Sequence, residues 1–241
     1  MALTDDAIDK IRGMILSGEL GPGSRLPPEP QLATRMGLSR NGIREAVKVL
    51  EASGVLTVRR GDGTYVTSLA PGLLLHGLRF AIELLREDTL LEVVEIRRIL
   101  EPSVTAVAAL RMSDGDLDQL EAILNDMRLA ADDLDELVEL DAAFHYAVIA
   151  AAGNETLTSL LDTLSVRTLR VRAWRGIIEN DAVSRTIDEH HAIYLALRSR
   201  DQTLAYARSL LHAHTSESLL RAAMSDRPAP PGSGEPPAQR G

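Results

Sequence analysis

The chain has 241 residues, enough for two modest domains, and its residues are 45% hydrophobic but only 3% aromatic. It has no cysteine, which excludes disulfides and thiolate metal sites. No apolar run approaches the length of a membrane span, and the acidic N-terminus lacks the apolar core of a signal peptide. We therefore expect a cytoplasmic protein with no membrane partner and with helical cores of Leu, Ala, Val and Ile.

The net charge of −9 is unevenly distributed along the chain. Residues 1–67 hold nine Lys and Arg against eight Asp and Glu, so the remainder holds 17 of the 26 basic and 27 of the 35 acidic residues. An acidic surface repels phosphate. The distribution of charge along the chain therefore indicates nucleic-acid binding better than the net charge does. Contact with a nucleic acid is therefore expected from the first 67 residues, and the acidic part needs a separate role.

The chain begins with two predicted helices. Apolar residues recur at helical spacing over residues 5–18, and the pattern ends at Gly18. A Gly-Pro-Gly-Ser turn follows at residues 21–24. Residues 29–36 then form a short helix.

A third helix and a hairpin follow directly. Ser39 is a suitable N-cap for a helix over residues 40–52. Residues 57–60 and 64–67 alternate in polarity around Asp62-Gly63, which is a strong hairpin signal. A capped helix that leads into a basic hairpin predicts a winged helix-turn-helix.

The rest of the chain predicts a second domain. Residues 69–74 read as a linker between a DNA-binding domain over residues 1–68 and a helical domain over residues 75–224. The helical pattern there is interrupted often enough to predict an all-α bundle of about six or seven helices. Residues 225–241 are rich in Pro, Gly and Ser, which predicts a disordered tail.

Basic side chains fall where a winged helix-turn-helix would meet DNA. Arg40 and Asn41 stand in the first turn after the Ser39 cap, and Arg44 follows one turn later. Arginine pairs bidentately with guanine and asparagine with adenine in the major groove, while a helix N-terminus favours phosphate. The alternative is that these are ordinary solvated charges. The candidate DNA-binding residues are Ser39, Arg40, Asn41, Arg44, Arg59 and Arg60.

These motifs resemble the GntR family of bacterial transcription regulators. The resemblance is carried by Leu26-Pro27-x-Glu29, Gly37-Leu38-Ser39-Arg40, Ile43-Arg44-Glu45-Ala46 and Gly61-x-Gly63-Thr64-x-Val66. It implies a dimeric repressor or activator that binds a short palindromic operator in double-stranded DNA. It further implies that Arg40 reads bases, that Arg44 contacts phosphate or bases, and that Arg60 reaches the minor groove.

One position departs from the family pattern. Members usually carry Arg directly after the Glu of the Leu-Pro-x-Glu motif, where it contacts DNA, and this chain has Pro30 after Glu29. Proline is tolerated in the first turn of a helix, so the fold should persist. The operator sequence or the affinity for it should differ from the family norm.

Four residues of the helical part could bind a metal ion. Asp141 and His145 are four apart and therefore share one helix face, while His190 and His212 stand on later predicted helices. Three neutral imidazoles and a carboxylate suit a divalent transition metal, and its open positions could take a ligand's carboxylate. The alternatives are a local Asp–His ion pair and ordinary surface or core histidines.

The spacing alone does not show which histidines would bind the metal. His191 and His214 stand beside the candidates, and neighbours on a helix point about 100° apart, so only one of each pair should face inward. The apolar pattern does not decide between His190 and His191.

The helical part resembles the ligand-sensing FCD domain of the FadR branch of the GntR family. The matching motifs are Glu95-x-Arg97-x-x-Leu100-Glu101, Asp141-x-x-Phe144-His145, Ala151-Ala152-Gly153-Asn154, Glu189-His190-x-x-Ile193, and Asp201 followed by His212. The resemblance implies a site for Zn²⁺, Ni²⁺ or a similar ion on Asp141, His145, His190 and His212. It also implies that the domain senses small organic acids.

The effector-binding residues predicted from the same resemblance are Arg97 and Asn154. A guanidinium at Arg97 could bind a carboxylate bidentately, or it could form a surface ion pair with Glu101 four residues on. Asn154 follows a glycine, so it could instead be only a helix-end residue.

Two other functions fit some of these features. The chain could be a DNA-binding dimer whose helical half has no metal or effector. It could also be a metal-dependent hydrolase with Glu189 as the general base, although nothing in the sequence shows that Glu189 reaches a bound water. A ligand-responsive regulator that is not an enzyme accounts for more of the motifs.

Overall fold

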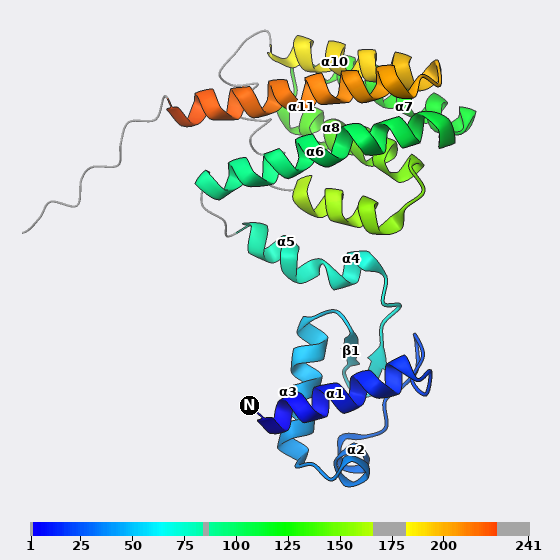
Figure 1. Ribbon diagram of the computed structural model, residues 1–241, viewed down its shortest axis with the longest axis vertical. Coiled ribbons are helices and arrows are strands. Elements are labelled where there is room, and N and C mark those ends of the chain that lie inside the picture. Colours follow the sequence, from blue (N-terminus) through cyan, green and yellow to red (C-terminus); the bar gives the residue numbers. More distant parts are fainter. Residues whose placement is uncertain (1, 84–86, 166–181, 226–241) are drawn as a thin grey trace, which may run out of the picture.

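The computed structural model describes residues 2–83, 87–165 and 182–225. Residues 2–66 form a small lobe, here called the head, and a larger bundle of helices follows it (Figure 1). The head contains three helices and a two-stranded antiparallel sheet: α1 (Ala2–Leu16), α2 (Glu29–Met36), α3 (Arg40–Ala52), β1 (Leu56–Arg59) and β2 (Gly63–Val66). This is the predicted winged helix-turn-helix.

Local sequence explains the turn between α2 and α3. Gly37 ends α2 in the left-handed conformation with φ of 70°, which favours glycine because it has no Cβ. Two residues later the Ser39 hydroxyl accepts a hydrogen bond of 3.1 Å from the backbone N–H of Gly42 and caps α3. Fully buried Ile11 and Ile43 then pack in the common core of the head.

The hairpin is shifted by one residue from its predicted position. The strands begin at Leu56 and Gly63 instead of at residues 57 and 64, and Arg59 pairs with Gly63 across a three-residue turn. Burial explains the shift, because Leu56 lies directly opposite Val66 and both side chains pack into the core of the head. Arg60 therefore lies in the turn of the wing rather than in a strand.

The bundle is entirely helical among its described residues. Its elements are α4 (Pro71–Leu74), α5 (His76–Glu83), α6 (Glu87–Arg111), α7 (Asp114–Leu129), α8 (Leu134–Ala151), a helix over residues 155–165, α10 (Ala182–Arg198) and α11 (Gln202–Ser225). Seven of these begin within residues 75–224, in agreement with the predicted six or seven. The segment predicted as a linker contains α4, and residues 226–241, predicted as a disordered tail, lie outside the described residues.

Long antiparallel contacts hold the bundle together. α6 packs along α11, α7 packs on α8, and α10 contacts α7 and α11. Phe144, Leu120 and Leu124 are fully buried in the principal core. Within the described ranges, no helix is both long and apolar enough to cross a membrane.

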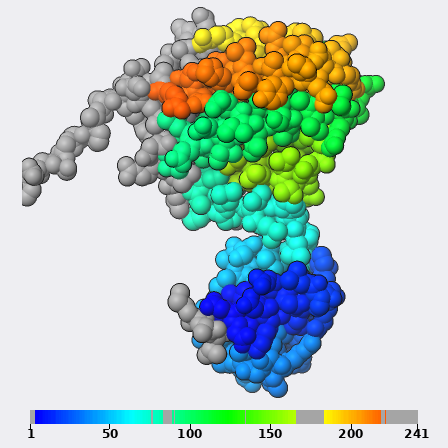
Figure 2. All heavy atoms as spheres, viewed as in Figure 1, coloured from blue at the N-terminus to red at the C-terminus, as the bar shows by residue number. Residues whose placement is uncertain are grey.

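The head joins the bundle through a narrow neck (Figure 2). Gly54, just after α3, has φ of 72°, and a Cβ on it would clash with the carbonyl oxygen of Leu73 in α4. A Cβ on Gly72 would in turn lie 3.5 Å from the Ser159 hydroxyl. α4 is therefore in close contact with the end of the α3 segment on one side and with the helix over residues 155–165 on the other.

Candidate metal centre and DNA-binding surface

Three helices bring four polar side chains together inside the bundle. α8 carries Asp141 and His145 one turn apart, α10 carries His190, and α11 carries His212. Their exposed fractions are 3%, 8%, 0% and 2%, respectively. Polar groups at such depth require partners, so this convergence calls for a chemical explanation.

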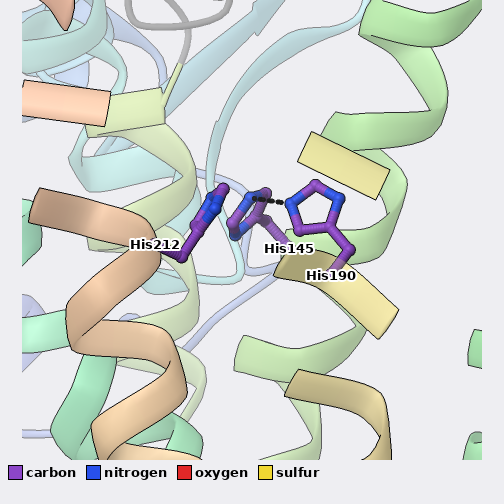
Figure 3. A group of neighbouring side chains, drawn as sticks. All are labelled: His145, His190 and His212. Carbon is purple, nitrogen blue, oxygen red and sulfur yellow. Dashed lines mark hydrogen bonds between the residues drawn. The ribbon is translucent and has the colours of Figure 1, made fainter. Parts of the chain in front are cut away.

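The three histidines point toward one another (Figure 3). Their ligand nitrogens all lie within 4.8 Å of one another, and the Nε2 atoms of His145 and His190 are 3.1 Å apart. Asp141 Oδ1 lies 3.6 Å from His190 Nε2 and 3.9 Å from His145 Nε2, both too long for hydrogen bonds. The three imidazole nitrogens thus converge, and the Asp141 carboxylate lies beside two of them.

Aromatic packing fixes the ring of His190. Phe144 stacks on it with 4.3 Å between ring centroids and 23° between planes, and meets His145 edge-on at 5.7 Å. Phe144 is itself fully buried. An apolar wall therefore keeps water from one side of the cluster and holds the imidazole in one orientation.

The donor set fits a divalent transition metal. Nitrogens bound to one ion at about 2.0–2.1 Å lie roughly 3.0–3.4 Å apart, and the His145–His190 separation of 3.1 Å falls in that range. His212 Nε2 is buried and has no hydrogen-bond partner among the described residues. A metal ion would satisfy that nitrogen; His145, His190 and His212 could hold it, and Asp141 stays the predicted fourth ligand.

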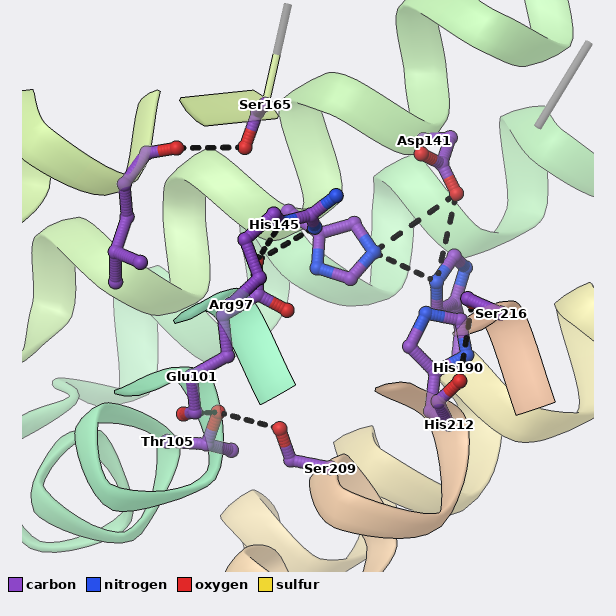
Figure 4. A network of polar contacts seen from close by, with 11 residues as sticks. Arg97, Glu101, Thr105, Asp141, His145, Ser165, His190, Ser209, His212 and Ser216 are labelled. Carbon is purple, nitrogen blue, oxygen red and sulfur yellow. Dashed lines mark hydrogen bonds and ion pairs between the residues drawn. The ribbon is translucent and has the colours of Figure 1, made fainter. Parts of the chain in front are cut away.

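A second polar network lies on α6 and α11 (Figure 4). Arg97 is 4% exposed, and its Nε donates a 2.6 Å hydrogen bond to Glu101 Oε1, which is equally buried. The Thr105 hydroxyl donates to the carbonyl oxygen of Glu101 at 2.8 Å and contacts the Ser209 hydroxyl at 3.1 Å. The Arg97–Glu101 pair is thus a buried ion pair, not the surface pair considered from the sequence, and its charges lie in the same polar interior as the histidine cluster.

The neighbouring histidines and Asn154 lie elsewhere. His191 is partly exposed and stacks on Tyr194, and His214 is exposed, so only His190 and His212 face the cluster. Asn154 is exposed, and its Oδ1 accepts a 3.1 Å hydrogen bond from the backbone N–H of Leu157. That is the contact of a helix N-cap, so an effector role for Asn154 stays a prediction without support from its contacts.

The exposed side of α3 carries the predicted DNA-binding residues. Arg40 and Asn41 are exposed in its first turn, while Ile43 and Val47 face the core. Arg44 is also exposed, and its Nη2 lies 3.1 Å from Glu29 Oε2 at the start of α2. Ser39 acts as the cap, so its hydroxyl is engaged by the backbone of α3.

The wing presents its arginines in different ways. The Arg59 guanidinium lies 4.4 Å from the ring centroid of Tyr65, a cation–π contact that orients it. The Tyr65 hydroxyl donates to Asp62 at 2.8 Å, and this hydrogen bond raises the pKa of Tyr65 above its ordinary value. Arg60 is exposed in the turn.

Sequence reasoning missed one part of the cluster. Glu189 accepts a hydrogen bond of 2.6 Å from His212 Nδ1, although the sequence suggested it only as a general base. No periodicity signals this contact, because it joins α10 to α11 across 23 residues.

A winged helix-turn-helix joined to an all-helical bundle with an internal histidine cluster defines a class of DNA-binding regulator, and comparison with known proteins agrees. Residues 3–66 match the gntR family of bacterial regulatory proteins, and residues 92–215 match the FCD domain. The chain belongs to the GntR family of transcriptional regulators and carries an FCD domain; it is a regulator and not an enzyme.

Individual relatives support the assignment. The HTH-type transcriptional regulator LutR of Bacillus subtilis (strain 168) is 31% identical over 211 residues, which cover 86% of this chain and 96% of LutR. The galactonate operon transcriptional repressor of Escherichia coli (strain K12) is 30% identical over 223 residues, which cover 90% of this chain and 96% of the repressor. The solved structure of Streptococcus agalactiae GntR superposes with a TM-score of 0.64 at 28% identity, covering 89% of this chain and 99% of that one.

Proposed function

We propose that this protein is a ligand-responsive regulator that binds a palindromic operator as a homodimer and senses a small organic acid in a metal-containing pocket of the bundle. The observation that carries the proposal is the buried convergence of His145, His190 and His212 in the same chain as an exposed, arginine-bearing α3. It acts in the cytoplasm, where its DNA target lies. Zn²⁺ or Ni²⁺ is the expected ion.

The proposed site would supply two kinds of group for a carboxylate. Asp141 and the three histidines would hold a divalent ion, which would supply a Lewis acid for carboxylate oxygens. Arg97 offers a planar guanidinium that can pair with a carboxylate, provided that Glu101 gives up part of its contact. The E. coli relative is named for galactonate, a hydroxy acid, which favours the same chemical class of effector here.

An exposed apolar stripe on α6 supports the homodimer. Ile96, Ile99, Val107 and Leu110 recur at spacings of 3, 8 and 3 residues, which place them on one face of the helix. All four side chains are exposed, and two of them retain more than half of their surface, at 57% and 60%. A second copy of the chain would cover this stripe and bring two heads to the two halves of a palindrome.

Effector binding can reach DNA through the neck. The helix over residues 155–165 contacts α4, and α4 contacts the segment just after α3, so movement of the bundle helices would change the position of the head. The effector must bind the two arrangements with different affinity, otherwise the equilibrium does not shift. If the acid is an inducer, it and the operator weaken each other's binding by the same factor.

Titration of genomic DNA fragments with and without acids tests this function. The metal-loaded protein should prefer particular fragments over random sequence, and a hydroxycarboxylic acid should change the apparent Kd for those fragments by roughly 5- to 150-fold. The same titration after removal of the metal with a chelator should show no response to the acid. Absence of any preferred fragment would refute the proposal that the protein is a transcriptional regulator with a specific operator.

The same experiment distinguishes the ligand-responsive regulator from the competing function, a DNA-binding dimer without a metal or effector. That protein would select a fragment equally well with and without chelator, and no acid in a panel of hydroxy acids, dicarboxylates and sugar acids would alter the binding. Such a result would contradict the sensory role of the bundle while leaving the DNA-binding role of the head intact.

A further inference from the structure

We infer that Glu189 is a positioning residue for the metal ligand His212, and this inference rests on the metal centre proposed above. The two side chains come from different helices, Glu189 from α10 and His212 from α11. Glu189 Oε2 and His212 Nδ1 are 2.6 Å apart, a short distance for a nitrogen–oxygen hydrogen bond. Glu189 keeps about a fifth of its side-chain surface exposed, whereas His212 keeps 2%.

The chemistry of this contact determines the tautomer of His212. An ionised carboxylate only accepts hydrogen bonds, so Nδ1 of His212 must carry the proton. Nε2 then has the free lone pair, and this is the buried atom that has no hydrogen-bond partner among the described residues. A neutral imidazole binds a metal only through a deprotonated nitrogen, so the contact presents the correct atom to the cluster.

Through this contact, α10 positions two of the four predicted metal ligands. His190 faces the cluster directly, and the preceding residue, Glu189, orients the ligand that α11 supplies. A carboxylate on the outer nitrogen raises the basicity of the ligating nitrogen and fixes the ring plane. This contact gives Glu189 a role beside the ligand His212 that needs no general base.

Metal affinity tests the assignment. Zn²⁺ binding is measured by competition with a chromophoric chelator for the wild type, Glu189→Gln, Glu189→Ala and the matched control Asp188→Asn, which changes an exposed carboxylate on the same helix. Glu189→Ala should weaken Zn²⁺ binding by roughly 10- to 100-fold. Glu189→Gln keeps an acceptor for Nδ1–H and should weaken Zn²⁺ binding by less than Glu189→Ala does. The Zn²⁺ affinity of Asp188→Asn should match that of the wild type. Zn²⁺ affinity of Glu189→Ala within twofold of the wild type would overturn the inference.

Imidazole ¹⁵N NMR of the metal-free protein provides a second readout, and its decisive measurement is made on the wild type. His212 of the wild type should be the Nδ1–H tautomer, and Glu189→Gln should raise the Nε2–H population. An Nε2–H tautomer in the wild type would overturn the inference. If the wild type binds no Zn²⁺ at all, the proposed metal centre itself fails; if it binds Zn²⁺ and Glu189→Ala binds equally well, only the positioning role fails.

Discussion

Arg44 on α3 and Glu29 at the start of α2 form an ion pair, with 3.1 Å between Nη2 and Oε2. The pair joins the two helices of the helix-turn-helix on its exposed side. Arg40, one turn earlier, has no such partner among the described contacts and points into solvent from the first turn of α3. The two arginines should therefore contribute differently to DNA binding: Arg40 is available to base edges, whereas Arg44 is held near the N-terminus of α2.

Substitution of the two arginines tests this difference. Arg40→Ala should reduce the preference for the operator over random DNA, because a bidentate base contact is worth about 1–3 kcal/mol of discrimination at each position. Arg44→Ala should weaken binding to all sequences and reduce the salt dependence by the equivalent of about one phosphate contact. Footprinting and salt titration measure both effects, with Arg128→Ala, an exposed arginine of α7, as the control. A normal footprint from Arg40→Ala would contradict the DNA interface.

Ser39 should act on stability through its cap. Ser39→Ala removes the acceptor for the Gly42 N–H and should lower the stability of the head by about 1 kcal/mol. Ser39→Asp restores an acceptor and should recover most of that loss. Urea unfolding of the three proteins measures the effect, and equal midpoints for all three would show that the cap contributes nothing.

The head could be predicted from sequence almost completely, because its signals are local. Ser39, the glycine turn and the apolar spacing of α3 all act within a few residues, and α3 ends at Ala52 as predicted. The predicted bounds of both hairpin strands were late by one residue because the strand positions depend on the burial of Leu56 against Val66, a tertiary property.

The site in the bundle was less accessible to sequence reasoning. Spacing alone placed Asp141 and His145 on one face, but the choice of His190 over His191 depends on how α10 packs against α11. The Glu189–His212 contact and the Arg97–Glu101 burial depend on the same packing, which no pattern within a single helix records. The family resemblance supplied the ligand set that spacing left open.

Metal binding should stabilise the bundle. An ion that binds only the folded state adds about 2.7 kcal/mol at a free concentration 100 times its Kd, so Zn²⁺ should raise the thermal unfolding midpoint and a chelator should reverse the rise. His190→Ala should abolish this response, and His214→Ala, which removes an exposed histidine, should retain it. Differential scanning calorimetry with and without Zn²⁺ measures the shift, and an equal shift in His190→Ala would place the ion elsewhere.

Acid should weaken the contact between α6 and α11. Glu217 is buried, and its hydrogen bond from Arg221, together with the charge of Arg98 2.8 Å away, lowers the pKa of its carboxyl below the ordinary value. A lowered folded-state pKa means that the stabilisation is present above the unfolded-state pKa and is lost as the pH falls through the folded-state pKa.

Glu217→Gln tests that pH dependence. It should cost about 1–2 kcal/mol at pH 7, and the difference from the wild type should shrink as the pH falls below the ordinary range of a glutamate carboxyl. Glu121→Gln, in an exposed pair with Arg198, is the control and should cost little at any pH. Unfolding midpoints from pH 3 to 7 measure both, and a difference for Glu217→Gln that is independent of pH would contradict the assigned cause.

The α6 stripe should mediate dimerisation. Ile99→Asp combined with Leu110→Asp places two charges on its exposed face, and burying them against a second copy would be costly. Light scattering should then report monomers, while Leu129→Asp, at an 86% exposed position on α7, should leave the dimer intact. If the doubly substituted protein is still a dimer, the interface must lie on a surface other than the α6 stripe.

The metal content of tag-free protein tests the central claim most directly. Elemental analysis by mass spectrometry should find about one equivalent of a divalent transition metal per chain in the wild type and a large loss in His145→Ala. A wild type without such an ion after purification and Zn²⁺ reconstitution, or a His145→Ala variant with undiminished metal, would contradict the claim that the buried histidines form a metal centre.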